Sequence, residues 1–204
     1  MNYVLELGKN AKAVQASLAD ASTTLKNDAL CAIANALRQR KNEIIEANRI
    51  DLESGRKNGM SESLLDRLAL SENRIDDIAS SVLEIVALPD PVGVIKNGST
   101  RPNGLNIEKV AVPMGTIAVI YEARPNVTID AAALCLKSGN AVILRGGKEA
   151  INSNKASARI MRDAIKSVGL DENCIQLVED TSRETANALS RIALPHTSPC
   201  ATCP

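Results

Sequence analysis

The sequence predicts an α/β protein in which helices and an antiparallel β arm precede part of a doubly wound parallel sheet. Up to about residue 90, apolar side chains show helical spacing, and over 92–112 apolar and polar side chains alternate roughly by twos. From Thr116 onward, short apolar segments alternate with helical stretches in the order strand, helix, strand, helix, strand. Right-handed crossovers would place these three strands side by side, as in one half of a doubly wound sheet.

The amino-terminal helices are predicted from two runs of residues. The first run has a polar face opposite apolar residues at mostly helical spacing, namely Leu25, Ala29, Ile33, Leu37, Ile44 and Ile45. The second run extends from about Ser61 to Leu88 and stops at Pro89-Asp90-Pro91, because proline interrupts helical hydrogen bonding.

Residues 92–112 are predicted to form an antiparallel β arm. The segment contains Asn97-Gly98 and Asn103-Gly104, and Asn-Gly readily takes the positive φ angles of tight hairpin turns. Such an arm can add a strand to a partner chain, so residues 92–112 are also a candidate surface for homo-oligomerisation.

The three sheet strands are expected at 116–121, 141–144 and 175–178. Each segment is short and apolar throughout, which is typical of parallel strands that are buried on both faces. The helical stretches between them end at Gly139 and Gly169, and glycine is the residue that most often closes a helix.

Composition and charge exclude several classes of protein. Lys plus Arg and Asp plus Glu number 24 each, so the basic field of a nucleic-acid binder is missing. The chain has no Phe or Trp and only Tyr3 and Tyr121, which leaves no stacking platform for single-stranded nucleic acid. No apolar run approaches the ~18 residues of a membrane span, and the amino terminus shows no signal peptide. A reducing cytoplasm is the expected location.

Ligands of doubly wound sheets bind beyond the carboxyl ends of the strands, which singles out three loops, 122–126, 145–149 and 179–182. The second loop, Arg145-Gly146-Gly147-Lys148-Glu149, combines cations with two glycines that would let the backbone approach a phosphate or a ribose closely. It lacks the spacing of a Walker A motif and of a Gly-x-Gly-x-x-Gly motif. A flexible loop with solvated charges is the alternative interpretation.

The first loop places Arg124 and Asn126 on either side of a proline at the end of a strand. Asn126 directly precedes a helical stretch, so its side chain can cap that helix. The same amide can instead donate to an oxyanion that forms during a reaction. The pattern alone favours the cap and leaves both interpretations open.

Two segments within residues 112–154, YEARPNVT and AVILRGGKEA, form a pattern that is specific to one protein family, both in sequence and in the spacing between them. They resemble the γ-glutamyl phosphate reductase (glutamate-5-semialdehyde dehydrogenase) branch of the aldehyde dehydrogenase superfamily. The resemblance continues into VEDTSRETANAL (178–189) and reaches back through NEIIEANRIDLESGRKNG and LLDRL. It covers roughly the first 190 residues.

The resemblance implies that residues 1–192 form part of an aldehyde-dehydrogenase-type cofactor-binding domain. It also implies an activity in proline biosynthesis, the NADPH-dependent reduction of L-glutamate 5-phosphate (γ-glutamyl phosphate) to L-glutamate 5-semialdehyde. In the superfamily mechanism a cysteine thiolate attacks the acyl phosphate, phosphate leaves, and hydride from NADPH reduces the thioester. A thiolate suits this role because it is a soft nucleophile and a good leaving group.

The resemblance also assigns roles to individual residues. Asn126 matches the asparagine whose amide holds the tetrahedral oxyanion, and Arg124 is a candidate contact for the acyl-phosphate leaving group. Arg145 is the candidate for the 2′-phosphate of NADPH, since arginine binds phosphate bidentately. The rest of that cofactor pocket would be formed by Gly146, Gly147, Lys148 and Glu149.

The sequence departs from the family after about Ile192. The family continues into further cofactor strands and a catalytic domain with a Gly-Asn-Cys nucleophile motif, whereas this chain continues with ALPHTSPCATCP, residues 193–204. We therefore expect a truncated chain that lacks the nucleophilic cysteine and is inactive. His196, Cys200 and Cys203 in the tail suggest zinc, but a fourth ligand is missing, so we predict no metal site and interpret the tail as out-of-frame sequence.

Two other functions remain as alternatives. A catalytically dead nucleotide-binding or assembly module would keep the arm and part of the cofactor pocket and would act through partners. A stand-alone phosphate-binding transferase is disfavoured, because no acid–base pair accompanies the glycines of the second loop.

Overall fold

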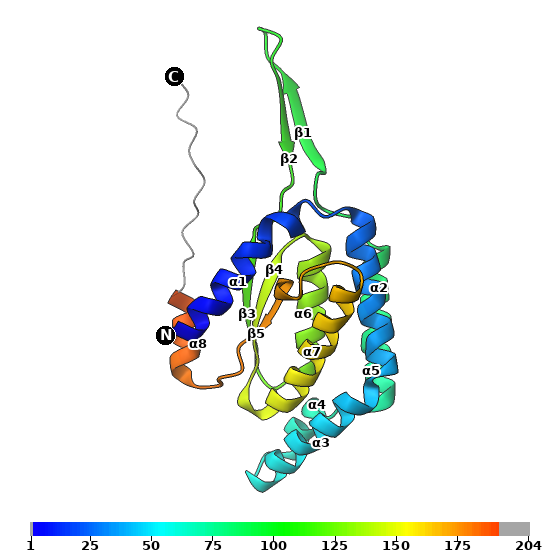
Figure 1. The fold of residues 1–204 in the computed structure, drawn as a ribbon, viewed down its shortest axis with the longest axis vertical. Coiled ribbons are helices and arrows are strands. Elements are labelled where there is room, and N and C mark those ends of the chain that lie inside the picture. The colour runs from blue at the N-terminus through cyan, green and yellow to red at the C-terminus, as the bar shows by residue number, and fades with distance from the viewer. Residues whose placement is uncertain (1, 192–204) are drawn as a thin grey trace.

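The computed structural model describes residues 2–191, which form an α/β fold (Figure 1). Five helices come first: α1 (Asn2–Ala19), α2 (Thr23–Gln39), α3 (Lys41–Lys57), α4 (Glu62–Leu68) and α5 (Glu72–Ala87). They are followed by β1 (Ile95–Thr100), β2 (Asn106–Val110), β3 (Thr116–Ile120), α6 (Pro125–Lys137), β4 (Ala141–Arg145), α7 (Ile151–Ser167), β5 (Ile175–Leu177) and α8 (Arg183–Arg191). Short 3-10 turns precede α7 and β5, at Lys148–Ala150 and Glu172–Cys174. Within residues 2–191, no helix is both long and apolar enough to cross a membrane.

The strands β3, β4 and β5 form a parallel sheet in that order. Ile120 of β3 lies opposite Arg145 of β4, and Leu144 lies opposite Leu177 of β5. Helix α6 packs on β4 and α7 packs on β5, while α1 crosses all three strands from the other side (Figure 1). The predicted α/β order, with amino-terminal helices, an antiparallel arm and a parallel sheet, is confirmed.

The hydrophobic core is aliphatic and joins the helices to the sheet. Helix α2 packs against both α5 and α7 and buries Leu30, Ile33 and Leu37 completely. The middle strand β4 buries residues 141–144, and α6 covers it with Ile129 and other small apolar side chains. Dispersion and hydrophobic burial in this layer hold the amino-terminal helices onto the sheet.

Two expectations about the elements are wrong in detail. The second helical run is split into α4 and α5, because the side chain of Ser71 caps α5 by accepting from Arg74 N–H at 3.2 Å. Strand β3 is also less buried than predicted, and Ile120 is 51% exposed. The reason is its position at the edge of the described sheet, where only β4 pairs with it.

The β arm, β1 with β2, projects from the body at the end opposite to the carboxyl ends of the sheet strands (Figure 1). Every residue of its two strands is exposed. The hairpin turn uses Asn103-Gly104, and Gly104 has φ +85°, whereas Asn97-Gly98 lies inside β1 and forms no turn. Large apolar side chains are exposed along this segment: Val94, Ile95, Leu105, Ile107, Val110, Val112 and Met114.

A buried ion pair fixes the base of the arm. Lys26 of α2, only 1% exposed, contacts the Asp90 carboxylate at 2.6 Å. The same carboxylate accepts from the Thr23 hydroxyl at 2.7 Å and from Val92 N–H at 3.0 Å. Burial raises the pKa of Asp90, but the Lys26 ammonium and the other two donors outweigh it, so the net pKa is lowered.

We expect Asp90→Asn to lower the free energy of unfolding by about 3 kcal/mol at pH 7, because it leaves the Lys26 ammonium buried without a counter-ion. Adding Lys26→Met should recover most of the loss. Because the pKa of Asp90 is lowered, its contribution to the free energy of unfolding is fully present above the usual carboxyl pKa. That contribution is lost as the pH falls through the lowered pKa of the folded state. Urea unfolding at neutral and acid pH measures both effects.

The control is Asp28→Asn, which changes an exposed carboxylate on α2, the helix that carries Lys26. Equal stability of wild type and Asp90→Asn at pH 7 would show that the pair does not hold the arm base.

Candidate functional site

Three loops meet at the carboxyl edge of the parallel sheet, as the sequence predicts. Tyr121 N–H donates to Arg145 O at 3.0 Å where β3 and β4 end, and Val178 N–H donates to Leu144 O at 2.8 Å on the other side. The first loop, 122–126, therefore lies beside the second loop, 145–149, which lies beside the third loop, 179–182.

The two glycines of the second loop pack against protein. A Cβ on Gly146 would lie 2.2 Å from Asn154 Nδ2 and 3.0 Å from the Tyr121 ring. A Cβ on Gly147 would lie 2.6 Å from the Glu149 carboxylate and 3.3 Å from the backbone nitrogen of Ala123. Both glycines are buried, so they allow the first two loops to approach each other closely. This close packing argues against the flexible-loop interpretation.

A chain of polar side chains connects the elements that flank these two loops: the end of β3, α6 and α7. The Tyr121 hydroxyl lies 2.6 Å from the Thr128 hydroxyl, which donates to Asn154 Oδ1 at 2.8 Å. Burial raises the pKa of Tyr121 to about 12. The phenol therefore stays neutral at physiological pH and serves as a structural hydrogen-bonding group.

A buried carboxylate from α3 fixes the point where the second loop enters α7. Asp51 accepts from Asn152 N–H at 3.2 Å and Asn152 Nδ2 at 2.8 Å. It also accepts from Ser153 N–H at 2.8 Å and from the Ser153 hydroxyl at 2.6 Å. Asn48, one turn earlier on α3, donates to the Ser153 hydroxyl at 3.0 Å. A carboxylate at a helix amino terminus satisfies unpaired N–H groups and complements the helix dipole.

The sequence analysis did not identify Asn48 and Asp51 as positioning residues. The signal was available, because α3 buries Ile44, Asn48, Asp51 and Gly55 on one face at spacings of three and four. Two polar side chains on a face that otherwise points into the core indicate buried partners elsewhere in the chain.

Arg145 extends from the second loop toward the third. Its Nη2 donates to Thr181 O at 2.8 Å and to Ser182 O at 3.4 Å. Its Nε is buried and has no partner within residues 2–191. Lys148 is exposed beside it, and Glu149 is half-buried. The guanidinium thus lies between the second and third loops, and its Nε–H remains available to donate a hydrogen bond.

The helix α6 begins at Pro125, with Arg124 at the N-cap position. The N-cap interpretation of Asn126 is therefore wrong, because proline is favoured at the first helical position and moves the helix start forward. Asn126 Nδ2 instead donates to Asp130 Oδ2 at 3.3 Å. Burial raises the pKa of Asp130, and the hydrogen bond from Asn126 offsets part of that rise. Arg124 and Asn126 both line a cavity of about 380 Å³ beside α4 and α5.

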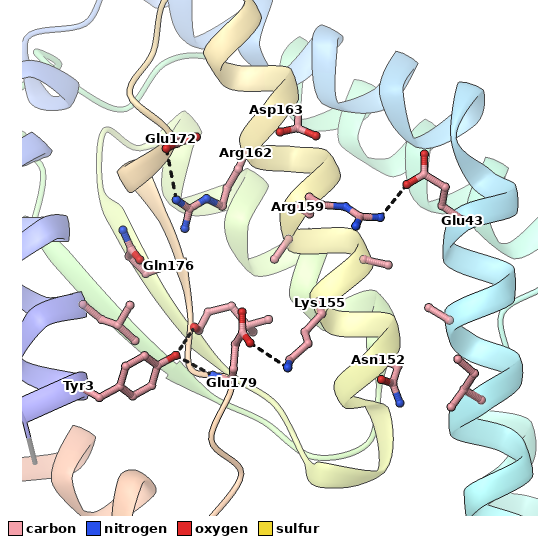
Figure 2. A pocket seen from close by; sticks show the side chains of 16 residues that line it. Tyr3, Glu43, Asn152, Lys155, Arg159, Arg162, Asp163, Glu172, Gln176 and Glu179 are labelled. Carbon is pink, nitrogen blue, oxygen red and sulfur yellow. Dashed lines mark hydrogen bonds and ion pairs between the residues drawn. The ribbon is translucent and has the colours of Figure 1, made fainter.

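A larger groove of about 720 Å³ runs along α7 between α3 and β5 (Figure 2). Its three cations each face a carboxylate: Lys155 with Glu179 at 2.8 Å, Arg159 with Glu43 at 2.7 Å, and Arg162 with Glu172 at 3.7 Å. Figure 2 shows these pairs spread along the groove. Because its positive charges are already balanced, the groove lacks the free cations that an anionic ligand requires, in spite of its size.

Two thiols in the described part of the chain, Cys135 and Cys174, are poor nucleophiles. Cys135 and Cys174 are buried, and burial raises the pKa of each thiol to about 11. The interpretation of both as core residues is confirmed. Cys31 is half-buried on α2. The tail residues His196, Cys200 and Cys203 lie outside the described residues.

The sequence model of the aldehyde dehydrogenase family matches residues 3–194. The gamma-glutamyl phosphate reductase of Syntrophomonas wolfei is 53% identical over 183 residues, which are 90% of this chain and 44% of that protein. Among solved structures, the gamma-glutamyl phosphate reductase of Thermotoga maritima superposes with a TM-score of 0.91 at 43% identity, covering 93% of this chain and 46% of the other. The corresponding structure from Saccharomyces cerevisiae gives a TM-score of 0.83 at 34% identity, covering 88% and 47%. The chain thus spans less than half the length of these relatives.

Proposed function

The chain belongs to the aldehyde dehydrogenase family, and from this we propose that it supplies the amino-terminal part of a γ-glutamyl phosphate reductase. The reaction is the NADPH-dependent reduction of L-glutamate 5-phosphate to L-glutamate 5-semialdehyde, the second step of proline biosynthesis. The observation that carries the proposal is the 53% identity to such a reductase over 90% of this chain. The cytoplasm, where thiols stay reduced, is the compartment that we propose for it.

The cofactor-binding role that we propose for residues 1–192 centres on Arg145. Its buried Nε has no partner within residues 2–191, which fits a ligand with further acceptor oxygens such as the 2′-phosphate of NADPH. Lys148 is exposed beside it and would add positive charge, while Gly146, Gly147 and Glu149 would complete that wall of the pocket. NADPH, when bound, supplies the hydride of the reaction.

The substrate role that we propose belongs to the first loop. Asn126 would donate its amide hydrogens to the oxyanion that forms on the acyl carbon, after releasing the Asp130 carboxylate that holds them at 3.3 Å. Arg124 is exposed and would bind the acyl-phosphate group. Neither residue can replace an attacking thiolate, and Cys135 and Cys174 are buried with raised thiol pKa values.

We therefore expect the chain alone to show no γ-glutamyl phosphate reductase activity. A chimera that joins residues 2–191 to the remaining part of the Syntrophomonas wolfei reductase should turn over, because the missing nucleophile is then supplied. The measurement is NADP- and phosphate-dependent oxidation of L-glutamate 5-semialdehyde, followed as NADPH formation.

Activity of the chain alone that is lost on Cys135→Ser or Cys174→Ser would contradict the assignment of both as core thiols. A folded but inactive chimera would argue against the reductase function. It would favour the alternative of a catalytically dead nucleotide-binding or assembly module, for which the exposed arm is the supporting observation.

We expect NADPH to bind the chain weakly, more tightly than NADH, and through Arg145. A charge-assisted bidentate contact contributes on the order of 1.5–3 kcal/mol, and association costs several kcal/mol of rotational and translational freedom. The dissociation constant should therefore be on the order of millimolar and should rise with salt. Fluorescence titration of both cofactors measures it.

Arg145→Gln should abolish the preference for NADPH, whereas Arg183→Gln, an exposed arginine after the third loop, should leave it unchanged. Equal binding of NADPH and NADH by the wild-type chain would remove Arg145 from the 2′-phosphate role.

For residues 92–112 we propose a role in homo-oligomerisation. A two-stranded ribbon is marginally stable alone, and here both strands are fully exposed and carry several large apolar side chains. Contiguous exposed apolar surface of this kind indicates a partner surface. The Lys26–Asp90 ion pair at the base of the arm would hold its direction against the body.

We expect the purified chain to self-associate at micromolar concentration, and Ile107→Asp with Val110→Asp to shift it to monomer. Burying each of these side chains is worth about 1.5–3 kcal/mol, so losing both should weaken association more than ~100-fold. Light scattering across a dilution series gives the mass. Leu64→Asp, at an exposed leucine on α4, is the matched control, and a monomeric wild type would contradict the role of the arm.

A further inference from the structure

The cavity of about 380 Å³ lies at the carboxyl end of β3, between the start of α6 and the connection from α4 to α5. It is lined by charged side chains from three elements. Arg124 comes from the first loop, Asp66 and Arg67 from α4, and Arg74 and Asp77 from α5. Some of these charged side chains already pair with other groups of the protein, and others do not.

Arg74 is already paired within the protein. Its guanidinium donates to the carbonyl oxygens of Asp66 and Ala69 and to the Asp66 carboxylate at 2.8 Å. It therefore holds the connection between α4 and α5 in place, which fixes the wall of the cavity. Asp66 is neutralised by the same contact.

Arg67, Arg124 and Asp77 have no ion pair and no side-chain hydrogen bond within residues 2–191, although all three line the same cavity. A guanidinium offers five donors in a rigid fork that matches a carboxylate or a phosphate. The groove along α7 presents the opposite case, because each of its three cations already faces a carboxylate. Unbalanced charge is therefore concentrated in the smaller cavity.

The amino end of α6 adds to the positive potential of this cavity. The helix has 13 residues and begins at Pro125, between Arg124 and Asn126. Pro125 has no N–H and Val127 N–H donates to Arg124 O at 3.1 Å, so in the first turn Asn126 N–H, which no side chain caps, carries the partial positive charge of the helix amino terminus.

We infer that this cavity binds the amino-acid end of the substrate, with Arg67 binding the α-carboxylate and Asp77 binding the α-ammonium group. The inference rests on the proposed function, and it gives roles to Arg67 and Asp77, to which the family resemblance assigned none. L-Glutamate 5-phosphate carries two anionic groups and one cationic group, and the cavity offers two unpaired cations and one unpaired carboxylate. Arg124 at the first loop then remains for the acyl phosphate, and Arg67 on α4 faces the other end of the molecule.

This arrangement makes Arg67 and Asp77 specificity-determining residues. A substrate with both an α-carboxylate and an α-ammonium group satisfies both side chains. An aldehyde or acyl phosphate that lacks either group does not form the corresponding contact and therefore binds less tightly.

The test is a titration of the chain with L-glutamate, glutarate and inorganic phosphate, followed by NMR chemical-shift changes. L-Glutamate should bind with a dissociation constant on the order of millimolar and more tightly than glutarate, which lacks the ammonium group. Arg67→Gln should weaken L-glutamate binding about tenfold or more. Asp77→Asn should remove the preference over glutarate without weakening glutarate itself. Arg124→Gln should weaken phosphate binding most.

The matched control is Arg56→Gln, which removes an exposed guanidinium from α3 outside the cavity. Circular dichroism of each variant shows whether it is folded. L-Glutamate that fails to bind the wild type, or binds Arg67→Gln as tightly as wild type, would overturn the inference. The NADPH titration and the chimera are independent of these results, so loss of the inference leaves the proposed reductase function to be judged by those two measurements. If phosphate alone binds and responds to Arg67→Gln, the cavity is a phosphate subsite and the assignment to the amino-acid end is wrong.

Discussion

The buried carboxylate of Asp51 is the constraint on which the geometry of the loops depends. It accepts four hydrogen bonds from Asn152 and Ser153, at the point where the second loop turns into α7. Because its four donors satisfy the charge, the carboxylate can remain buried inside the protein. Asn48 joins the same cluster by bonding Ser153, Leu68 O and Leu70 N–H. One face of α3 therefore fixes both the second loop and the break between α4 and α5, which bounds the smaller cavity.

The two edges of the sheet differ, and the difference explains where the loops are open. Because Val178 N–H faces β4, the neighbouring Leu177 O and Glu179 N–H face outward, and the Tyr3 hydroxyl of α1 bonds both of them (Figure 2). This contact closes the β5 edge. On the other side β3 pairs only with β4 within residues 2–191, and Ile120 remains half exposed. In a doubly wound sheet the fourth strand pairs beside the first, and ligands bind at that switch point, so the order β5-β4-β3 places the first loop at the crevice.

Much of the fold could be predicted from the sequence because its signals are local. Helical spacing located α2, α3 and α5, and the closing glycines located the ends of α6 and α7, where Gly139 and Gly169 have φ of 72° and 94°. The details that failed depended on contacts distant in sequence. The exposure of β3 depends on its place in the sheet order, and the break before α5 is stabilised by Asn48, 22 residues before Leu70.

The candidate site, like the fold, has features that the sequence predicts and features that depend on contacts distant in sequence. The three loops could be located from strand order alone, because parallel strands end at a common edge. The partners of their side chains could not, since Arg145 bonds Thr181 across 36 residues and Asp51 bonds Ser153 across 102. That Arg67 and Asp77 have no charged partner within residues 2–191 is also invisible in sequence, because Asp66 pairs with Arg74 instead. Tertiary contacts therefore decide which of several similar charges remain available to a ligand.

The hydrogen bond from Asn126 to Asp130 has a consequence for the oxyanion role that we propose for Asn126. An amide that donates to a half-buried carboxylate is held in one orientation without a ligand, which limits the conformational entropy lost on binding. Burial raises the pKa of Asp130, so the protein environment disfavours its charged form and the carboxylate is a poorly stabilised acceptor. An oxyanion that forms next to the amide carries a full charge and would compete with Asp130 for the same donor. The amide would then be positioned before the reaction and released to the oxyanion as its charge develops, which is how a preorganised donor stabilises a transition state more than a ground state.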